Sequence, residues 1–260
     1  TEERGQGTII RKHGFRFIPL PTTRSGTHLL QEIRVLWMLY RWYKQERPDI
    51  VHHVAVKPVT YGSIAARLAQ VPRVVNALSG LGFLFINADQ NRWLHRLVMW
   101  AFHYGFRNPR LRFILQNPDD YAMIQSLGIF RKEQLSLIKG SGVDLEAYPP
   151  TALPSQMPRL VLLPARMLWD KGVGEFVAAA SLLKSRWGSQ VRFVLAGEAD
   201  TANRAGIEER QLLEWNNEKM VEWVGFQSNM PAWYQNSYIV VLPSYREGLP
   251  KSLIEACAAG

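Results

Sequence analysis

The feature that most constrains the fold is the repeated alternation of short apolar runs with helix-like segments. The runs at 191–196 and 238–242 are rich in Val, Ile and Leu, and each leads through a loop into a helical pattern. Apolar runs of this length are typical of parallel strands buried on both faces. Because parallel strands need crossover connections, we predict an α/β chain built of doubly wound sheets.

The alternation occurs in two blocks that are separated by a proline-rich segment. We predict strands in the first block at 15–20, 49–56, 73–78, 112–115 and 135–138, with a turn at Lys57-Pro58. The second block restarts with strands at 160–164, 191–196, 220–224 and 238–242. Prolines between the blocks are typical of a linker: Pro149, Pro150, Pro154 and Pro158. We therefore expect two Rossmann-like domains, 1–145 and 146–260, that face a cleft.

The composition of the chain argues against a membrane-spanning, secreted or disulfide-linked protein. The chain has 260 residues, of which 47% are hydrophobic, and charge interrupts every apolar stretch well before the ~18 residues of a membrane span. The start lacks the apolar core of a signal peptide, and the single Cys257 excludes an intrachain disulfide. We expect a cytoplasmic protein, and we expect this chain to be a fragment, because it lacks an initial Met and stops within a helix.

The excess of basic over acidic residues lies entirely in the first half. Residues 1–145 hold 20 Lys and Arg against 10 Asp and Glu, whereas residues 146–260 hold 11 against 12. A basic half is compatible with nucleic acid, an anionic membrane surface or a phosphorylated substrate. No zinc-finger, basic-zipper or RNA-recognition pattern is present, so we expect no nucleic-acid partner.

An aromatic helix is predicted at 91–106, where Trp and Phe side chains alternate with Arg and His. Such a face can lie at a membrane interface. More often such a pattern belongs to a core helix with solvated basic edges. Peripheral contact with the inner face of the cell membrane is therefore one of two interpretations.

Charged side chains gather where the second-half strands end. Arg166 and Lys171 follow the first strand and precede a helix, and two cations beside free backbone N–H groups suit a diphosphate. Glu247 and Glu255 follow the last strand with seven residues between them, and a carboxylate facing the crevice can accept ribose hydroxyls. Together these groups predict a site for a nucleoside diphosphate.

Each of these charged residues also has an interpretation that involves no ligand. Arg166 and Lys171 could pair with Asp170 and Glu175 on the surface, and both glutamates could be solvated. The glycine loop that contains Gly80 and Gly82 could be an ordinary turn. No P-loop sequence is present, so a P-loop nucleotide hydrolase is excluded.

The second half resembles the retaining glycosyltransferases of family 4, which have the GT-B fold. The resemblance rests on the segments 142–144, 165–172, 195–198 and 223–226, and on the spacing of Glu247 and Glu255. The first half resembles the branch that makes capsular polysaccharides and lipid-linked glycans, through 48–52, 57–58, 76–83 and 113–120. The resemblance covers the chain from about residue 48 to its end.

The resemblance implies a role for each site residue. Arg166 and Lys171 would neutralise the departing diphosphate and, with Glu247 at the donor sugar, form the catalytic group. Glu255 would hold the ribose. The remaining donor contacts would come from Gly225 and Phe226 near the base and from the amides of Gly248 and Leu249. Lys57, Gly80 and Gly82 would lie on the acceptor side. Such enzymes need no metal or other cofactor, and no Asp-x-Asp motif occurs in this chain.

The sequence departs from the family pattern at two histidine positions. His52 matches the first histidine of a His-x-His pattern, but Val54 takes the second place. Ser79-Gly80-Leu81 stands where many relatives carry a histidine.

The resulting hypothesis is a retaining transferase that moves a sugar, expected to be a hexose or N-acetylhexosamine, from a nucleotide diphosphate sugar, expected to be UDP-linked. The acceptor would be a polyprenyl-diphosphate-linked or other lipid-linked saccharide in capsule, O-antigen or exopolysaccharide synthesis. A non-catalytic nucleotide-sugar-binding subunit and another GT-B enzyme, such as a nucleotide-sugar epimerase, are the alternatives.

Overall fold

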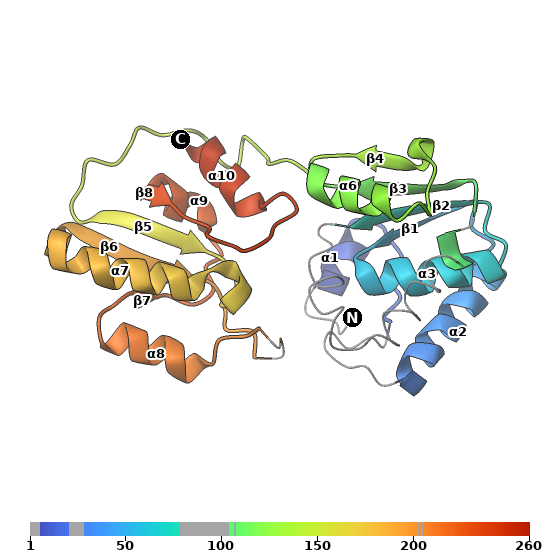
Figure 1. Cartoon of the computed structure of the whole chain (residues 1–260), viewed down its shortest axis with the longest axis horizontal. Helices are drawn as coiled ribbons and strands as arrows, with labels where there is room; N and C mark the ends of the chain where they lie inside the picture. Colours follow the sequence, from blue (N-terminus) through green and yellow to red (C-terminus); the bar gives the residue numbers. More distant parts are fainter. Residues whose placement is uncertain (1–5, 21–28, 79–103, 107, 202, 204) are drawn as a thin grey trace. The chain divides into compact units, whose positions relative to one another are not determined.

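The structure is a computed structural model of the chain, and it describes residues 6–20, 29–78, 104–106, 108–201, 203 and 205–260 (Figure 1). The chain divides into two compact units, Thr1–Lys139 and Gly140–Gly260. The division lies between residues 139 and 140, ahead of the boundary after residue 145 that the sequence suggests.

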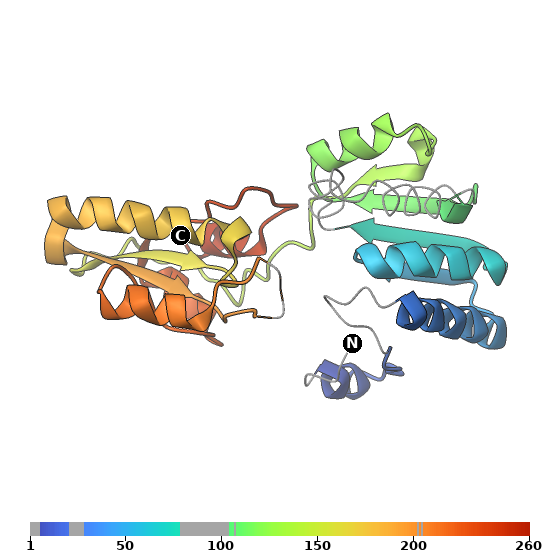
Figure 2. The same ribbon diagram turned by 60° about the horizontal axis from the view of Figure 1, so that its bottom comes forward.

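The first unit contains a parallel sheet with the strand order β1-β2-β3-β4. Its strands are β1 (Ile50–Val54), β2 (Arg73–Leu78), β3 (Leu111–Leu115) and β4 (Leu135–Leu137), and its described helices are α1 (Gln6–Lys12), α2 (Leu29–Glu46), α3 (Val56–Leu68) and α6 (Pro118–Ser126), with a short 3-10 turn, η1 (Lys132–Gln134). The helix α3 lies alongside α2 (Figure 2). All sheet pairings are parallel, so the α/β prediction is confirmed for this half.

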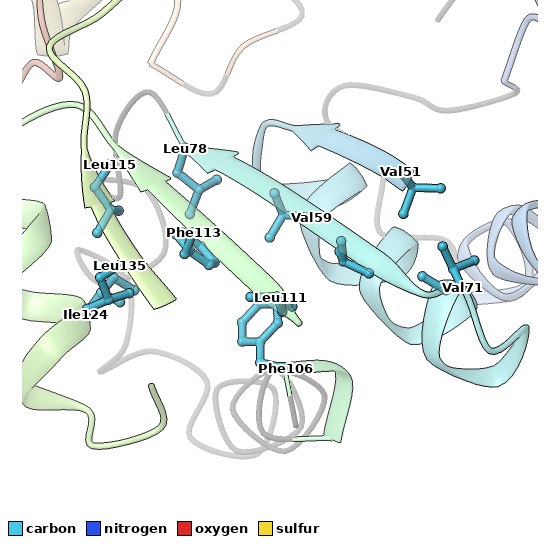
Figure 3. Close-up of a cluster of buried hydrophobic side chains, with 12 residues drawn as sticks. Val51, Val59, Val71, Leu78, Phe106, Leu111, Phe113, Leu115, Ile124 and Leu135 are labelled. Atoms are coloured by element: carbon cyan, nitrogen blue, oxygen red, sulfur yellow. The ribbon is translucent and has the colours of Figure 1, made fainter. Parts of the chain in front are cut away.

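The core of the first unit forms where alternate strand residues point to one face. On β3, Leu111, Phe113 and Leu115 are all at most 1% exposed, and the ring of Phe106 packs edge-on against Phe113 with centroids 5.6 Å apart (Figure 3). Burial of each such side chain contributes about 1.5–3 kcal/mol. Apolar packing of this kind fixes the register of the sheet, since a slip of one residue would expose these side chains.

A buried polar chain links four elements of the first unit. The hydroxyl of Tyr43 donates to Nε2 of His53 (2.9 Å), Nδ1 of His53 donates to Oδ1 of Asn76 (2.8 Å), and Nδ2 of Asn76 donates to the hydroxyl of Ser63 (2.8 Å). Oδ1 of Asn76 can only accept, so Nδ1 carries a hydrogen; burial lowers the pKa of His53 and thereby favours the neutral ring, whose Nε2 accepts from Tyr43. Buried polar groups require such partners, so the chain ties α2, β1, β2 and α3 together.

The second unit contains a parallel sheet with the strand order β7-β6-β5-β8. Its strands are β5 (Arg159–Pro164), β6 (Val191–Ala196), β7 (Glu222–Trp223) and β8 (Ser237–Val240), and its helices are α7 (Val173–Trp187), α8 (Glu209–Asn217), α9 (Met230–Gln235) and α10 (Lys251–Ala259), with 3-10 turns η2 (Trp169–Lys171) and η3 (Gly188–Gln190). Leu163 packs with residues of α7 and α8, whereas Leu160 and Leu162 pack with residues of α9 and α10. Helices cover both faces, as expected of a doubly wound sheet.

Two local predictions for the first half are wrong. Residues 15–20 form no strand: Phe15 is 69% exposed and Phe17 lies under the guanidinium of Arg11, so the run has no buried face to place against a sheet. Lys57-Pro58 is no turn but part of the first turn of α3. Pro58 is tolerated there because the first N–H groups of a helix have no acceptor within it.

The aromatic helix predicted at 91–106 lies largely outside the described residues. Only residues 104–106 are described, and they are helical. No helix within the described ranges is both long enough and apolar enough to cross a lipid bilayer.

Candidate functional site

The site is built from loops that follow β5 and β8, which are neighbours in the second sheet. Because parallel strands end at the same edge, the loop after β5 (165–172) and the loop after β8 (241–250) lie side by side. The first loop is anchored by Met167 and Leu168, whose side chains are at most 1% exposed. Its polar residues are thereby held on a rigid base, ahead of the first turn of α7.

Gly172 is where the two loops meet most closely. Its φ of +72° lies in the left-handed region, and a Cβ added there would lie 2.2 Å from the carbonyl oxygen of Pro243. The backbone N–H of Tyr245 donates to the carbonyl of Asp170 (3.0 Å), and the Tyr245 hydroxyl donates to the carboxylate of Glu175 at the start of α7. Only glycine meets both the backbone angle and the close approach, so Gly172 sets the distance between the loops.

The structure brings Lys171 and Glu247 into direct contact. The Nζ of Lys171 lies 2.5 Å from Oε1 of Glu247, although the residues are 76 positions apart in the chain. Their side chains are 22% and 24% exposed, so water reaches the pair without surrounding it. Charge-assisted hydrogen bonds of this length are among the stronger ones in proteins. A cation and a carboxylate are thus held together at the sheet edge.

Arg166 has a different carboxylate partner from the one that the sequence suggests. Its guanidinium lies 2.7 Å from Oδ2 of Asp200, in the loop after β6. Glu175 is bonded to Tyr245 instead. The alternative in which Asp170 and Glu175 neutralise Arg166 is therefore not what the structure shows. Because the Arg166 side chain is 53% exposed, solvent screens its ion pair with Asp200, and the guanidinium can change partners at small cost.

Glu255 lies on α10 and is more buried than expected for a carboxylate that faces an open crevice. The residue is 8% exposed, and its Oε2 accepts a hydrogen bond from the Tyr234 hydroxyl (3.1 Å). Burial and the nearby Glu255 carboxylate raise the pKa of the Tyr148 phenol. Lys251, one helical turn earlier, approaches Oε1 at 3.4 Å. The two tyrosines are members of the site that the sequence reasoning missed, because no local pattern places them beside Glu255.

The remaining predicted donor contacts lie in the loops of the same unit. Gly225 has a φ of +66°, and its carbonyl accepts a hydrogen bond from the N–H of Gly197 (2.8 Å). Phe226 is 68% exposed, so its ring is free for stacking. Gly248 and Leu249 are half-buried in the loop that leads into α10, and Leu249 approaches Gly140.

The residues predicted to lie on the acceptor side belong to the first unit. Lys57 lies in the first turn of α3 with its Nζ 2.7 Å from Oε1 of Glu32. Burial, together with the Glu32 carboxylate, raises the pKa of the nearby Tyr61 phenol. Gly80 and Gly82 lie outside the described residues.

A metal site is not formed by the part of the chain that the structure describes, where no three His, Cys, Asp or Glu side chains are grouped to hold an ion. Arg166 and Lys171 contribute positive charge near the carboxyl ends of β5 and β8.

Two family models match the chain, one in each half. Residues 1–110 match the model described as glycosyl transferase 4-like, and residues 146–260 match the model described as glycosyl transferases group 1. The matched ranges include most of the segments on which the sequence resemblance rests, but not 113–120 or 142–144.

Curated relatives match across the whole chain. It is 29% identical over 266 residues to the N,N'-diacetylbacillosaminyl-diphospho-undecaprenol alpha-1,3-N-acetylgalactosaminyltransferase of Campylobacter jejuni, covering 96% of this chain and 67% of that enzyme. It is 26% identical to the UDP-Gal:alpha-D-GlcNAc-diphosphoundecaprenol alpha-1,3-galactosyltransferase of Escherichia coli, covering 100% of this chain and 68% of that enzyme.

The fold also matches a solved structure. The crystal structure of HepE from Anabaena in complex with UDP and glucose superposes with a TM-score of 0.72 at 17% identity, covering 98% of this chain and 68% of that one.

Proposed function

We propose that this chain, whose two halves match glycosyltransferase family models and whose fold matches that of HepE, transfers a sugar from a UDP-linked donor to a lipid-linked saccharide with retention of anomeric configuration. The observation that carries the proposal is the contact between Lys171 and Glu247 at the carboxyl edge of the second sheet. Binding of a nucleotide sugar requires a cation for the diphosphate and a carboxylate for the sugar hydroxyls, and this contact brings one of each together.

The donor diphosphate is assigned to Arg166, Lys171 and the start of α7. The helix α7 spans 15 residues and begins directly after Gly172. Its first N–H groups have no acceptor within the helix and attract anions. Arg166 and Lys171 add two full charges where negative charge develops on the leaving diphosphate, which lowers the barrier to departure.

Each side chain has one part of the donor to hold. Glu247 accepts hydrogen bonds from hydroxyls of the donor sugar, with the amides of Gly248 and Leu249 beside it. Glu255 accepts from the ribose, and Phe226 with Gly225 lies at the base. Donor binding then exchanges partners: Lys171 leaves Glu247 for phosphate, and Arg166 leaves Asp200.

Retention follows if the acceptor hydroxyl attacks the face that the diphosphate leaves. The anomeric C–O bond to phosphate breaks first, through an oxocarbenium-like state, and the new C–O bond forms on the same face. The departing phosphate oxygen takes the proton of the acceptor hydroxyl. The two cations supply the charge that a divalent metal supplies in other transferases, so we expect activity to persist in EDTA.

The acceptor is assigned by the names of the relatives and by charge. Both curated relatives act on undecaprenyl-diphosphate-linked sugars. The first half of this chain has ten more Lys and Arg than Asp and Glu, which favours an anionic diphosphate acceptor at a membrane surface. We place the enzyme in the cytoplasm, at the inner face of the cell membrane, with Lys57, Gly80 and Gly82 toward the acceptor.

The test is to incubate the purified protein with a panel of UDP-sugars and polyprenyl-diphosphate-linked saccharides, and to weigh the lipid products by mass spectrometry. The proposal expects an acceptor heavier by one sugar residue, with an equal amount of UDP released. UDP-sugar binding without any product would instead favour a binding subunit. A changed sugar stereochemistry with no acceptor adduct would indicate an epimerase.

A further inference from the structure

Glu255 lies beside two phenols, Tyr234 and Tyr148, that the donor contacts proposed above do not use. Tyr234 is 5% exposed and donates to Oε2 of Glu255. The rings of Tyr148 and Tyr234 pack with centroids 5.9 Å apart, and the Glu255 carboxylate contributes to a raised pKa of the Tyr148 phenol. These three residues come from three separate segments of the second unit: the loop before β5, α9 and α10.

The Tyr234 phenol that binds this carboxylate has apolar surroundings. Tyr234 belongs to a buried cluster with Leu160, Leu162 and Ala259. A carboxylate in such a place is costly unless donors compensate for lost water. Lys251 contributes little, because its side chain is 67% exposed and lies 3.4 Å from Oε1. The two phenols are therefore the main compensation for burying the charge.

Both phenols stay protonated in this arrangement. Burial, followed by the Glu255 charge, raises the pKa of Tyr234 far above its usual range, and the same two causes raise the pKa of Tyr148. They can only donate to the carboxylate. An ionised carboxylate has about four acceptor positions, so two donors leave room for two more.

We propose that Tyr234 and Tyr148 are positioning residues that fix the Glu255 carboxylate for two neighbouring hydroxyls of the donor ribose. The proposal rests on the ribose contact assigned to Glu255 above. Glu has three rotatable side-chain bonds, and fixing them before the ligand arrives removes an entropy cost from binding. The phenols thus act on affinity through Glu255 and touch no part of the donor themselves.

Calorimetric titration of the purified protein with UDP and with 2′,3′-dideoxy-UDP tests the proposal. We expect Tyr234→Phe to weaken UDP binding about tenfold, the factor that corresponds to about 1.4 kcal/mol for one charge-assisted hydrogen bond. Binding of the dideoxy nucleotide should stay within about twofold of the unsubstituted protein, because it lacks both hydroxyls. Tyr148→Phe should act in the same direction, and the double variant should lose more than either.

Three further results decide the matter. Tyr238→Phe is the matched control: it removes a phenol from the same unit but keeps the ring that stacks on Arg159, so both nucleotides should bind normally. Equal loss of both nucleotides in Tyr234→Phe, or no loss of UDP, would overturn the positioning role. Glu255→Gln separates the two claims: if it leaves the ratio of the two affinities unchanged, the ribose contact itself fails.

Discussion

At the scale of residues, the candidate site depends on a cation and a carboxylate that neutralise each other until a donor arrives. Lys171 and Glu247 lie 2.5 Å apart, and each is assigned a different part of the donor. Their contact holds both side chains in place, yet it must be broken for binding. The roles assigned to the two side chains can therefore be separated by substituting one of them.

Glu247→Gln should separate nucleotide binding from sugar transfer. Removal of the carboxylate charge frees Lys171 for phosphate, so we expect UDP to bind as tightly as before or more tightly. Transfer should fall about 10²-fold, because a contact to the donor sugar that strengthens in the transition state is lost. Calorimetry with UDP and initial rates of transfer measure the two effects. Parallel loss of both would argue against the assigned division of roles.

His53 gives the first unit a defined response to acid. Its pKa is lowered by burial, so the neutral ring stabilises the fold above the unfolded value of 6.5. As the pH falls below 6.5, the unfolded state binds a proton that the folded state resists, and the free energy of unfolding decreases. A protonated ring also cannot accept the Tyr43 hydrogen bond.

Urea unfolding of the first unit between pH 7.5 and 5 should show this loss. His53→Gln should flatten the pH dependence, whereas His52→Gln, at the exposed neighbouring position, should leave it intact. An equally steep pH dependence in His53→Gln and the unsubstituted protein would refute the assignment.

At the scale of elements, the strand positions follow from the sequence where a run is buried on both sides. The predicted runs 73–78 and 191–196 coincide with β2 and β6. The run 15–20 has similar residues but no sheet to join, and sequence alone cannot tell the two cases apart. Pairing between Arg166 and Asp200, 34 positions apart, depends on loop geometry that local patterns do not encode.

The residues of the candidate site also differ in how far the sequence predicts them. The spacing of Arg166, Lys171, Glu247 and Glu255 could be recognised, because strand ends in parallel sheets converge. The enclosure of Glu255 by Tyr148 and Tyr234 could not, because it depends on how α9 and the segment before β5 pack on α10. Contacts within an element are predictable from periodicity, whereas contacts between elements need the tertiary structure.

Gly172→Ala should disturb the meeting of the two loops. A side chain there costs about 1–2 kcal/mol for the left-handed backbone, and the clash with Pro243 adds about 1–3 kcal/mol. Gly225→Ala, in the same unit, has a φ of +66° but open space around the added Cβ, so it should incur only the first cost. Urea unfolding compares the two variants, and equal destabilisation would contradict the close packing.

At the scale of the whole molecule, the two units differ in charge more than in architecture. Both contain four-stranded parallel sheets, yet the basic excess lies entirely in the first half of the chain. An asymmetric charge of this kind suits a protein that holds a nucleotide sugar with one half and an anionic lipid acceptor with the other.

The charge asymmetry predicts salt-sensitive binding to membranes. We expect the protein to sediment with vesicles containing phosphatidylglycerol at 0.1 M salt and to be released at 1 M, where the Debye length falls to about 3 Å. Vesicles of phosphatidylcholine alone should bind little at either concentration. Binding that is indifferent to lipid charge would contradict an electrostatic membrane contact.

The central claim is that Lys171, opposite Glu247, is where the donor diphosphate is held during transfer. The most direct measurement is the rate of sugar transfer for three variants: Lys171→Ala, Lys171→Arg and, as a control at the far end of the same helix, Lys184→Ala. We predict a loss of about 10²–10³-fold in Lys171→Ala, partial activity in Lys171→Arg, and normal activity in the control. Undiminished transfer by Lys171→Ala would contradict the account.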